Sequence, residues 1–330
     1  MSVSGKIKHF LKEQHDFDQF FREISANYRI PMSLVKFDSL LCRFVYGAPV
    51  SQYIGFNLYQ KNRHERNCFV TDGRTKKLLK QLNGAPCEEE KTVDEKNIFN
   101  RVYCQFIKRE WIYVPEASDA EIEAFLHKYE RLIVKPTDLT KGEGVHKINS
   151  ADALVNLPQF CADARRQRLL MEEIIVQHPM LQEVNPSSVN TIRIATVRDR
   201  QGIVHIFGAS LRGGGAGSEV DNLHAGGVQY PIDIQTGLIS SGGVTFDGKK
   251  SILYHPSTNK QMVGLRIPFW DQVLATVTEA AKIPEQLRYL GWDVAITENG
   301  CELIEANSSQ GCNGMQLDGV GKYPYLKQFI

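Results

Sequence analysis

Gly291-Trp-Asp-Val-Ala-Ile-Thr-Glu-Asn-Gly-Cys-Glu-Leu-Ile-Glu-Ala-Asn307 is the stretch that decides the fold. Its Asn-Gly pair is strongly favoured in two-residue hairpin turns, so the pattern predicts two antiparallel strands, Trp292–Thr297 and Glu302–Glu305. Alternate residues of a strand share a face, so Glu305 and Asn307 point together, and antiparallel pairing brings Asp293 beside them. Three such oxygen donors suit Mg²⁺. Taken alone, a surface hairpin with ordinary acids explains the pattern about equally well.

Upstream, Arg131-Leu-Ile-Val-Lys-Pro136 predicts a buried strand that ends on a cation, and a glycine-containing turn follows it. Lys135 can hold phosphate oxygens while backbone N–H groups near Gly142 and Gly144 close over them. The Gly-Lys-Ser/Thr of a Walker loop is absent from this stretch. Lys96, at the start of a predicted helix 96–106, is a second candidate phosphate cation. An ordinary surface turn and a solvated lysine are the competing interpretations.

A further predicted strand, Leu169–Val176, carries adjacent acids and aliphatic residues. Glu172 and the main chain near Ile175 fit the edge of an adenine base, although the segment by itself would be only a strand.

The remaining pattern predicts three regions: a helical N-terminal region (1–93), a central α/β region (94–180) and a β-rich C-terminal region (181–330). Residues 84–92 break the periodicity and predict an exposed linker before the boundary near Asp94. Ser118 is the expected N-cap of a helix over 119–129. Other predicted elements are helices 10–24, 75–82 and 270–281 and strands 111–114, 191–198, 203–211 and 227–233.

Composition excludes several functional classes. The chain has 330 residues, with 39 Lys and Arg against 38 Asp and Glu, so its charge gives no sign of a nucleic-acid partner. Seven scattered cysteines without a Cys-x-x-Cys pair indicate reduced thiols, so we expect a cytoplasmic protein. No apolar run predicts a signal peptide or stable membrane insertion. The oligomeric state is not indicated.

In their order along the chain, these motifs resemble the ATP-grasp superfamily, and most closely the sugar-transfer-associated ATP-grasp proteins. The resemblance covers about residues 94–316 and is softer over Tyr46-Gly47, Tyr53, Glu65-Arg66 and Asn83. It rests on Asp94-Glu-Lys-Asn-Ile-Phe99, Ile133-Val-Lys-Pro136, Glu172-Glu-Ile-Ile-Val-Gln-His-Pro179, Ser188-Val-Asn-Thr-Ile-Arg193, Leu211-Arg212, Asp221-Asn-Leu-His-Ala-Gly-Gly227, Gly291-Trp-Asp-Val294 and Ile304-Glu-Ala-Asn307.

The resemblance implies an α+β fold of ATP-grasp type, with two lobes sandwiching ATP and a mostly helical N-terminal extension. It implies an ADP-forming carboxylate–amine ligase that works through an acyl phosphate and uses ATP and Mg²⁺. The implied roles are the ATP phosphates for Lys96, Lys135 and Asn222; the lid for Gly142 and Gly144; adenine for Glu172 and Ile175; Mg²⁺ for Asp293, Glu305 and Asn307; the transferred phosphate and acyl phosphate for Arg193 and Arg212; and the substrate for His224.

Several alternatives stay open. The pattern of residues 1–90 differs from the strand–helix lobe with which the superfamily usually begins, and this lobe helps to select the substrate. The expected substrates are therefore only small-molecule or sugar-linked carboxylates and amines, in surface polysaccharide or small-metabolite synthesis. A kinase acting on an amide, amine or hydroxyl fits the same ATP site, and a non-catalytic nucleotide-binding protein is a third reading. Arg193 and Arg212 can instead form core ion pairs, and His224 can be a buried structural histidine. Candidates for holding the ribose are Gln177, Glu183 and Asn190.

Overall fold

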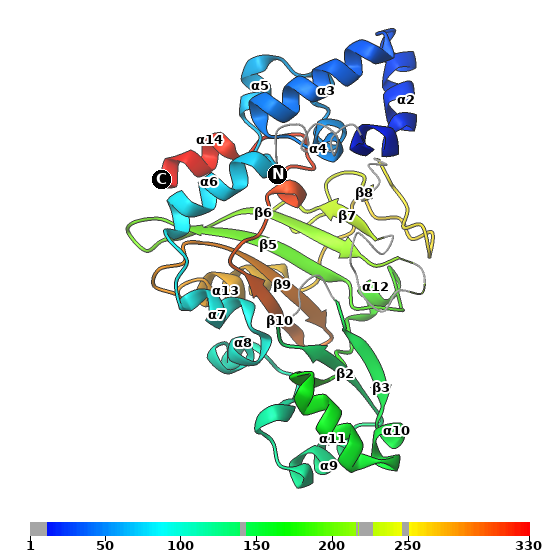
Figure 1. The fold of residues 1–330 in the computed structure, drawn as a ribbon, viewed down its shortest axis with the longest axis vertical. Helices are drawn as coiled ribbons and strands as arrows, with labels where there is room; N and C mark the ends of the chain where they lie inside the picture. The colour runs from blue at the N-terminus through cyan, green and yellow to red at the C-terminus, as the bar shows by residue number, and fades with distance from the viewer. Residues whose placement is uncertain (1–11, 139–142, 216, 218–226, 246–250) are drawn as a thin grey trace.

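The computed structural model describes residues 12–138, 143–215, 217, 227–245 and 251–330. A cluster of N-terminal helices lies at one end of the molecule, a six-stranded sheet in the middle and a four-stranded sheet at the other end (Figure 1). This mixed arrangement of helices and antiparallel sheets, with a helical N-terminal region, confirms the predicted fold class. No helix within the described ranges combines the length and apolar character needed to cross a bilayer.

The six-stranded sheet contains most of the predicted strands and is antiparallel throughout. The predicted hairpin is present, and both of its strands begin earlier than the sequence pattern indicated. In order across the sheet, the strands are β10 (Gly300–Asn307), β9 (Tyr289–Thr297), β5 (Thr191–Arg198), β6 (Val204–Gly213), β7 (Val228–Pro231) and β8 (Val244–Thr245).

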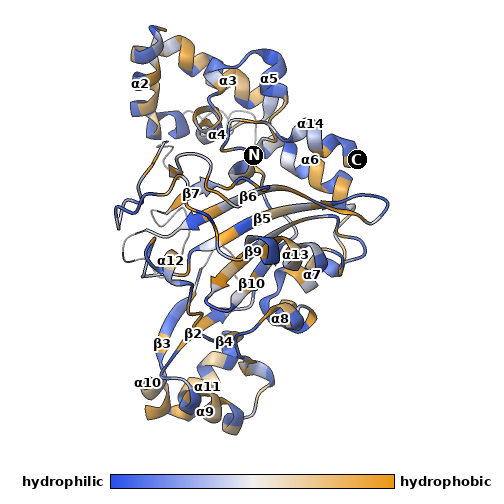
Figure 2. Cartoon of the chain, turned by 180° about the vertical axis from the view of Figure 1, so that it is seen from behind, coloured by the Kyte–Doolittle hydropathy of each residue, from blue (hydrophilic) through white to orange (hydrophobic). Residues whose placement is uncertain are grey.

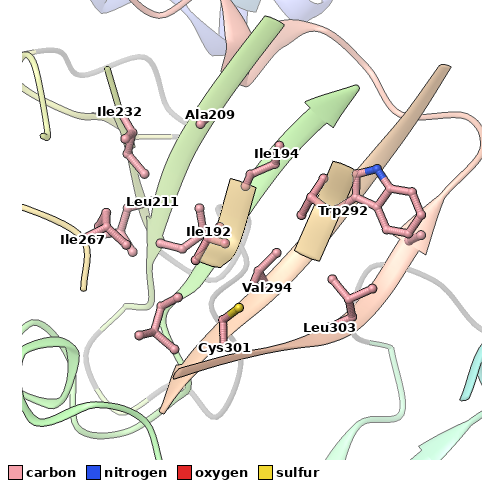
Figure 3. Packing of buried hydrophobic residues seen from close by; sticks show 14 of the residues in the cluster. Ile192, Ile194, Ala209, Leu211, Ile232, Ile267, Trp292, Val294, Cys301 and Leu303 are labelled. Carbon is pink, nitrogen blue, oxygen red and sulfur yellow. The ribbon is translucent and has the colours of Figure 1, made fainter. Parts of the chain in front are cut away.

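One face of this sheet forms the main hydrophobic core. Ile192, Ile194, Trp292 and Val294 point into it from the neighbouring strands β5 and β9 (Figure 3). Three helices cover this face: α7 (Glu89–Asp94), α8 (Lys96–Val102) and α13 (Trp270–Ala280). The packing therefore joins α8 to the large sheet, although the division at residue 94 assigned it to the central region.

The opposite face of the sheet is covered at one end by α6 (Asp72–Asn83), η5 (Asn313–Met315) and α14 (Tyr323–Leu326), followed by η6 (Lys327–Phe329). The Asn83 side chain fixes α6 to the sheet. Its Oδ1 accepts the N–H groups of Arg288 (3.0 Å) and Tyr289 (2.7 Å), and its Nδ2 donates to the carbonyls of Tyr289 (3.0 Å) and Ser308 (3.2 Å). Four main-chain groups at the start of β9 and the end of β10 thus depend on one amide.

The four-stranded sheet forms the other lobe, with a core shared by its strands and helices. As predicted, Ser118 caps α9 through a capping box with Glu121. Strand β3 was not predicted, because its four residues are only partly buried and show no clear alternation. The elements are β1 (Trp111–Tyr113), β4 (Leu169–Glu173), β2 (Arg131–Pro136) and β3 (His146–Asn149), in sheet order, with η3 (Val114–Glu116), α9 (Asp119–Lys128), α10 (Ser150–Val155) and α11 (Leu157–Arg166).

The N-terminal cluster is helical, as predicted, and has a hydrophobic core of its own. Arg66 closes it by donating from Nη1 (2.7 Å) and Nη2 (2.8 Å) to the two carboxylate oxygens of Asp38. Gly47 has a φ of +69°, and a Cβ there would lie 2.6 Å from the Cα of Gly73. The elements are α2 (Asp18–Tyr28), α3 (Met32–Tyr46), α4 (Val50–Gly55), η1 (Leu58–Gln60) and α5 (Arg63–Asn67).

The prediction of an exposed linker over residues 84–92 is wrong in its second half, where α7 begins at Glu89. The Glu89 carboxylate accepts the N–H groups of Glu285 (2.9 Å), Gln286 (2.7 Å) and Leu287 (3.2 Å). A run of glutamates resembles a solvated loop in sequence. Here one of them satisfies backbone donors almost 200 positions away in the chain.

Candidate active site

A row of charged side chains crosses the large sheet on the face opposite the main core. Asp293 on β9 is paired in register with Glu305 on β10 and with Arg193 on β5, so the three side chains share a face. Arg193 donates from both Nε and Nη2 to the Asp293 carboxylate, the second bond measuring 2.7 Å. Arg212 on β6 donates from Nη1 to the same carboxylate at 3.2 Å. The structure therefore brings Asp293, Glu305 and the two arginines together.

The pKa values of the two carboxylic acids in this row are shifted in opposite directions. Burial opposes ionisation of Asp293, but Arg193 and Arg212 outweigh it and hold its pKa below the ordinary value. Burial raises the pKa of Glu305 to about 7, and the neighbouring Asp293 carboxylate adds to the rise. The two arginines therefore compensate the negative charge of Asp293, whereas the negative charge of Glu305 is compensated less well.

The third predicted metal ligand, Asn307, follows at the end of β10, opposite Gly291. The Nδ2 of Asn307 is buried without a hydrogen-bond partner. Gln310 lies over Gly291, where a Cβ would come within 1.7 Å of its Oε1, and this oxygen accepts a bond of 3.4 Å from Arg193. Glycine at position 291 is what gives Gln310 access to the row.

These residues fit a divalent cation. The carboxylates of Asp293 and Glu305 are adjacent, and the Asp293 carboxylate and burial together raise the pKa of Glu305, as expected where a cation would be stabilised. The amide of Asn307 follows on the same strand and has an oxygen that could join them as a ligand. No group of three or more His, Cys, Asp or Glu arranged for a metal occurs in the described part of the chain. The donor set is thus two carboxylates and one amide, which leaves room for water and phosphate ligands.

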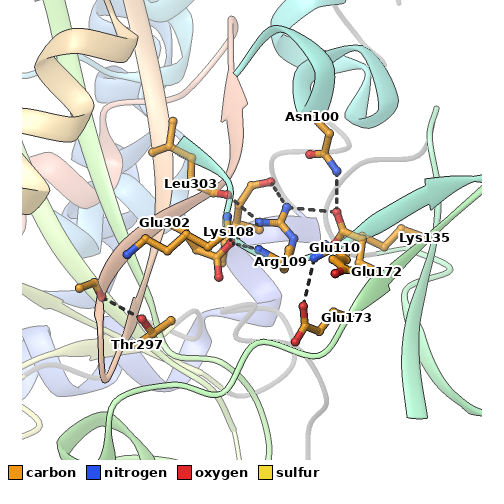
Figure 4. A network of polar contacts seen from close by, with 12 residues as sticks. Asn100, Lys108, Arg109, Glu110, Lys135, Glu172, Glu173, Thr297, Glu302 and Leu303 are labelled. Atoms are coloured by element: carbon orange, nitrogen blue, oxygen red, sulfur yellow. Dashed lines mark hydrogen bonds and ion pairs between the residues drawn. The ribbon is translucent and has the colours of Figure 1, made fainter. Parts of the chain in front are cut away.

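A second charged cluster lies where the four-stranded sheet meets the large one (Figure 4). Glu172 on β4 is 2% exposed and accepts hydrogen bonds from Asn100 (2.9 Å) and Arg109 (3.1 Å). Its other oxygen forms an ion pair with Lys135 at the end of β2. Burial opposes ionisation of Glu172, but Arg109 and Lys135 overcome it and lower its pKa.

Lys96, at the first position of α8, stands between the two clusters. Burial lowers its pKa, the carboxylate of Glu305 opposes that shift, and the ammonium group of Lys135 reinforces it. Glu172 also acts on it. Lys96 is therefore close enough to interact with charged groups of both sheets. The charged residues predicted to contact ATP thus lie in one region of the molecule.

Sequence reasoning missed Arg109 and Glu302, which join the two sheets. Arg109 donates from Nη1 to Glu302 (3.0 Å) and the Leu303 carbonyl (2.8 Å), and from Nη2 to Glu172 and the Ile304 carbonyl (3.3 Å). Glu302 also accepts the main-chain N–H of Arg109 at 3.2 Å. Both side chains are nearly fully buried. Their separation of 193 positions leaves no local pattern that would reveal them.

The family model of sugar-transfer-associated ATP-grasp proteins matches residues 74–329 of the chain. The chain belongs to this family. No curated protein matches it.

Several solved ATP-grasp structures are similar. The ATP-grasp ligase PsnB, complexed with a phosphomimetic variant of its minimal precursor, Mg and ADP, is 12% identical, with 75% of this chain and 60% of that chain covered and a TM-score of 0.45. The ADP complex of N5-carboxyaminoimidazole ribonucleotide synthetase is 10% identical (67% and 46% covered, TM-score 0.43). The L-amino acid ligase from Bacillus licheniformis is 15% identical (74% and 49% covered, TM-score 0.43). The chain thus spans about half to three fifths of their lengths.

Other predicted residues of this ATP-grasp protein are placed less directly. Gly142, Asn222 and His224 lie outside the described residues. Gly144 has a φ of +72°, which only glycine adopts readily and which suits a tight turn after β2. Ile175 is half-buried just beyond the end of β4.

All three ribose candidates have structural partners, and the exposed Glu183 forms an ion pair with Lys260. The Gln177 side chain donates to the carbonyls of Asn185 and Ser188 and accepts the main-chain N–H of Asn190. Asn190 is fully buried and donates to Gln177 and the Leu181 carbonyl. Both therefore organise the segment before β5.

Proposed function

We propose that the chain is an ATP-dependent, ADP-forming ligase that joins a carboxylate to an amine through an acyl phosphate. The single observation that carries the proposal is the meeting of two groups of charged residues. One is the row Glu305–Asp293–Arg193 with Arg212, and the other is Lys96 and Lys135. Phosphoryl transfer needs charge neutralisation and alignment more than covalent help from the protein, and this arrangement provides both.

Asp293, Glu305 and Asn307 would hold Mg²⁺, which would neutralise the β- and γ-phosphate oxygens of ATP. Lys135 is held in place by Glu172, so its ammonium group has a fixed position from which to bind phosphate oxygens. Lys96 provides a second cation at the start of α8, where helix N–H groups add a partial positive charge.

In this proposal the side chain of Glu172 does not contact adenine itself. Both of its carboxylate oxygens are engaged by Asn100, Arg109 and Lys135. Its side chain would therefore fix the phosphate-binding lysine, while main-chain groups near Ile175 would meet the base edge. We retain Gly142 and Gly144 as the lid, Asn222 for the phosphates and His224 for the substrate.

In the reaction, a substrate carboxylate oxygen attacks the γ-phosphorus of ATP, ADP leaves, and an amine then attacks the acyl carbon and expels phosphate. Arg212 makes one long bond to Asp293 and lies beside Arg193, whose fork is already committed to that carboxylate. Arg212 would stabilise the transferred phosphate directly, and Arg193 would orient Asp293. The substrates would be small-molecule or sugar-linked acids and amines in surface polysaccharide or small-metabolite synthesis, handled in the cytoplasm.

The test is the mass of the product after incubation with ATP, Mg²⁺, a candidate acid and a pool of amines. A condensed product with one ADP released per bond supports the ligase. A stable phosphorylated product without any condensed species would assign the same site to a kinase. Glu305→Ala should abolish Mg²⁺-dependent turnover. Its matched control is Glu298→Ala, in the exposed hairpin turn, which should leave turnover unchanged.

A further inference from the structure

Helix α3 carries an apolar surface that nothing in the described chain covers. Five large apolar side chains of α3 are exposed, by between 44% and 62%: Leu34, Phe37, Leu41, Phe44 and Val45. Its opposite face is buried in the N-terminal cluster through Val35, Cys42 and Tyr46. A helix that is apolar on both faces normally has both faces covered.

The charged residues of α3 do not interrupt this surface. Lys36 forms an ion pair with Asp18 of α2, and Asp38 forms one with Arg66 of α5. The third charged residue of the helix, Arg43, is half-buried. Ser33 is the one exposed polar residue of the helix. The absence of an exposed basic flank on α3 distinguishes it from helices that bind anionic membrane surfaces, which carry Lys and Arg beside the apolar face.

The spacing of the exposed residues indicates the kind of partner. Leu34, Phe37, Leu41 and Phe44 follow each other at intervals of three, four and three, the spacing of the seam between two paired helices. From Leu34 to Val45 this seam runs along about 17 Å of the helix. A seam of large apolar residues without charges is complementary to itself, as a two-fold interface requires.

The available area matches this partner. Tyr28 and Ile30, at the adjacent end of α2, are also exposed, by 45% and 36%. Together with the five residues of α3 they expose on the order of 600 Å² of apolar surface. A standard interface buries about 800 Å² per partner, so a polar rim would complete it. The helix also lies at the end of the molecule away from the four-stranded sheet (Figure 1), so a partner there would leave the candidate active site open.

We propose that the exposed face of α3, defined by Leu34, Phe37, Leu41, Phe44 and Val45, pairs with the same face of a second copy of this chain in a two-fold homodimer. The dimer does not depend on the proposed ligase activity. Figure 2 shows the alternating apolar and polar residues of this helix from the reverse side.

The test is the molar mass of the full chain by light scattering during size-exclusion chromatography. Wild type should show twice the 37.3 kDa chain mass from the low micromolar range upward. Phe37→Glu/Phe44→Glu should be monomeric, and Val155→Glu/Ile203→Glu, which places the same charges on exposed apolar residues elsewhere, should stay dimeric. Circular dichroism verifies folding, and Leu41→Arg is the alternative if the double variant does not fold.

Three outcomes would overturn the proposal. The first is a wild-type protein that is monomeric throughout the range, which would include the case in which residues 1–11 cover this face. The second is a dimer that persists in the folded Phe37→Glu/Phe44→Glu variant. The third is a monomer that sediments with phosphatidylcholine or phosphatidylserine vesicles and loses that binding in the variant, which would assign the face to a membrane.

Discussion

Replacing Arg109 with methionine tests whether the two sheets are held together by one buried guanidinium group. The substitution keeps most of the side-chain volume but removes hydrogen bonds to two carboxylates and two carbonyls. Breaking a buried ion pair by removing one partner costs about 3–5 kcal/mol, because an uncompensated charge is left behind. Lys135 still neutralises Glu172, so the stranded charge is that of Glu302. We expect the free energy of unfolding to fall by about 3 kcal/mol.

Urea denaturation followed by tryptophan fluorescence measures this loss. Trp111 lies on β1 of the small sheet and Trp292 on β9 of the large one, so the signal reports both lobes. The control is Arg101→Met, which removes an ion pair with Glu116 whose side chains are 48% and 54% exposed. It should cost less than about 1 kcal/mol.

Two further variants sharpen the result. Arg109→Lys keeps a charge but cannot reach both carboxylates, so it should cost about half as much as the methionine. Adding Glu302→Gln to Arg109→Met removes the stranded charge and should recover about 1–2 kcal/mol. A loss below about 1 kcal/mol in Arg109→Met, equal to that of Arg101→Met, would refute the view that Arg109 joins the sheets.

Glu305 has a folded pKa of about 7, above the ordinary 4.5, so the folded state binds more protons than the unfolded state between these two pH values. The free energy of unfolding should therefore fall as pH rises through that window, by about 3 kcal/mol. Denaturation at several pH values should show this slope in wild type and a flatter one in Glu305→Gln; equal slopes would contradict the assignment. Lys135→Met should weaken ADP binding at least about tenfold in calorimetry, while Lys128→Met, which alters an exposed ion pair, should not; unchanged affinity would remove Lys135 from the site. Asn83→Ala leaves four main-chain groups without their partner and should lower the melting temperature, with a loss of about 2–3 kcal/mol, whereas a loss under about 0.5 kcal/mol would mean that water replaces the amide.

Much of the large sheet could be predicted because its information is local. The hairpin turn lies at Glu298-Asn299, one residue before the predicted Asn-Gly pair, and it sets the register as far as Leu303. An irregularity between Leu303 and Glu305 then shifts the register by one residue, and this shift puts Glu305 opposite Asp293. Strand β5 follows the predicted bounds for the same reason. The short strand β3 was missed because partial burial leaves no alternation to detect.

Long-range contacts could not be predicted in this way. Glu89 looked like part of a charged linker, yet it caps the segment before β9. Glu172 was matched to adenine by its place in a motif, yet its two oxygens are held by Arg109, Lys135 and Asn100. No sequence pattern pairs residues 63 or 196 positions apart.

By itself, the sequence determined the antiparallel hairpin, the helical N-terminal region and the order of lysines, acids and arginines that marks the family. These follow from periodicity, turn chemistry and motif order, all of which are properties of neighbouring residues. Only the tertiary structure decided which cation neutralises which carboxylate. Two arginines pair with Asp293, whereas Glu305 is less well neutralised. Arg109 pairs with both Glu172 and Glu302. The physical reason is that Coulomb energy depends on burial and on distance through space. Neither quantity can be obtained from the number of residues that separate two groups in the sequence.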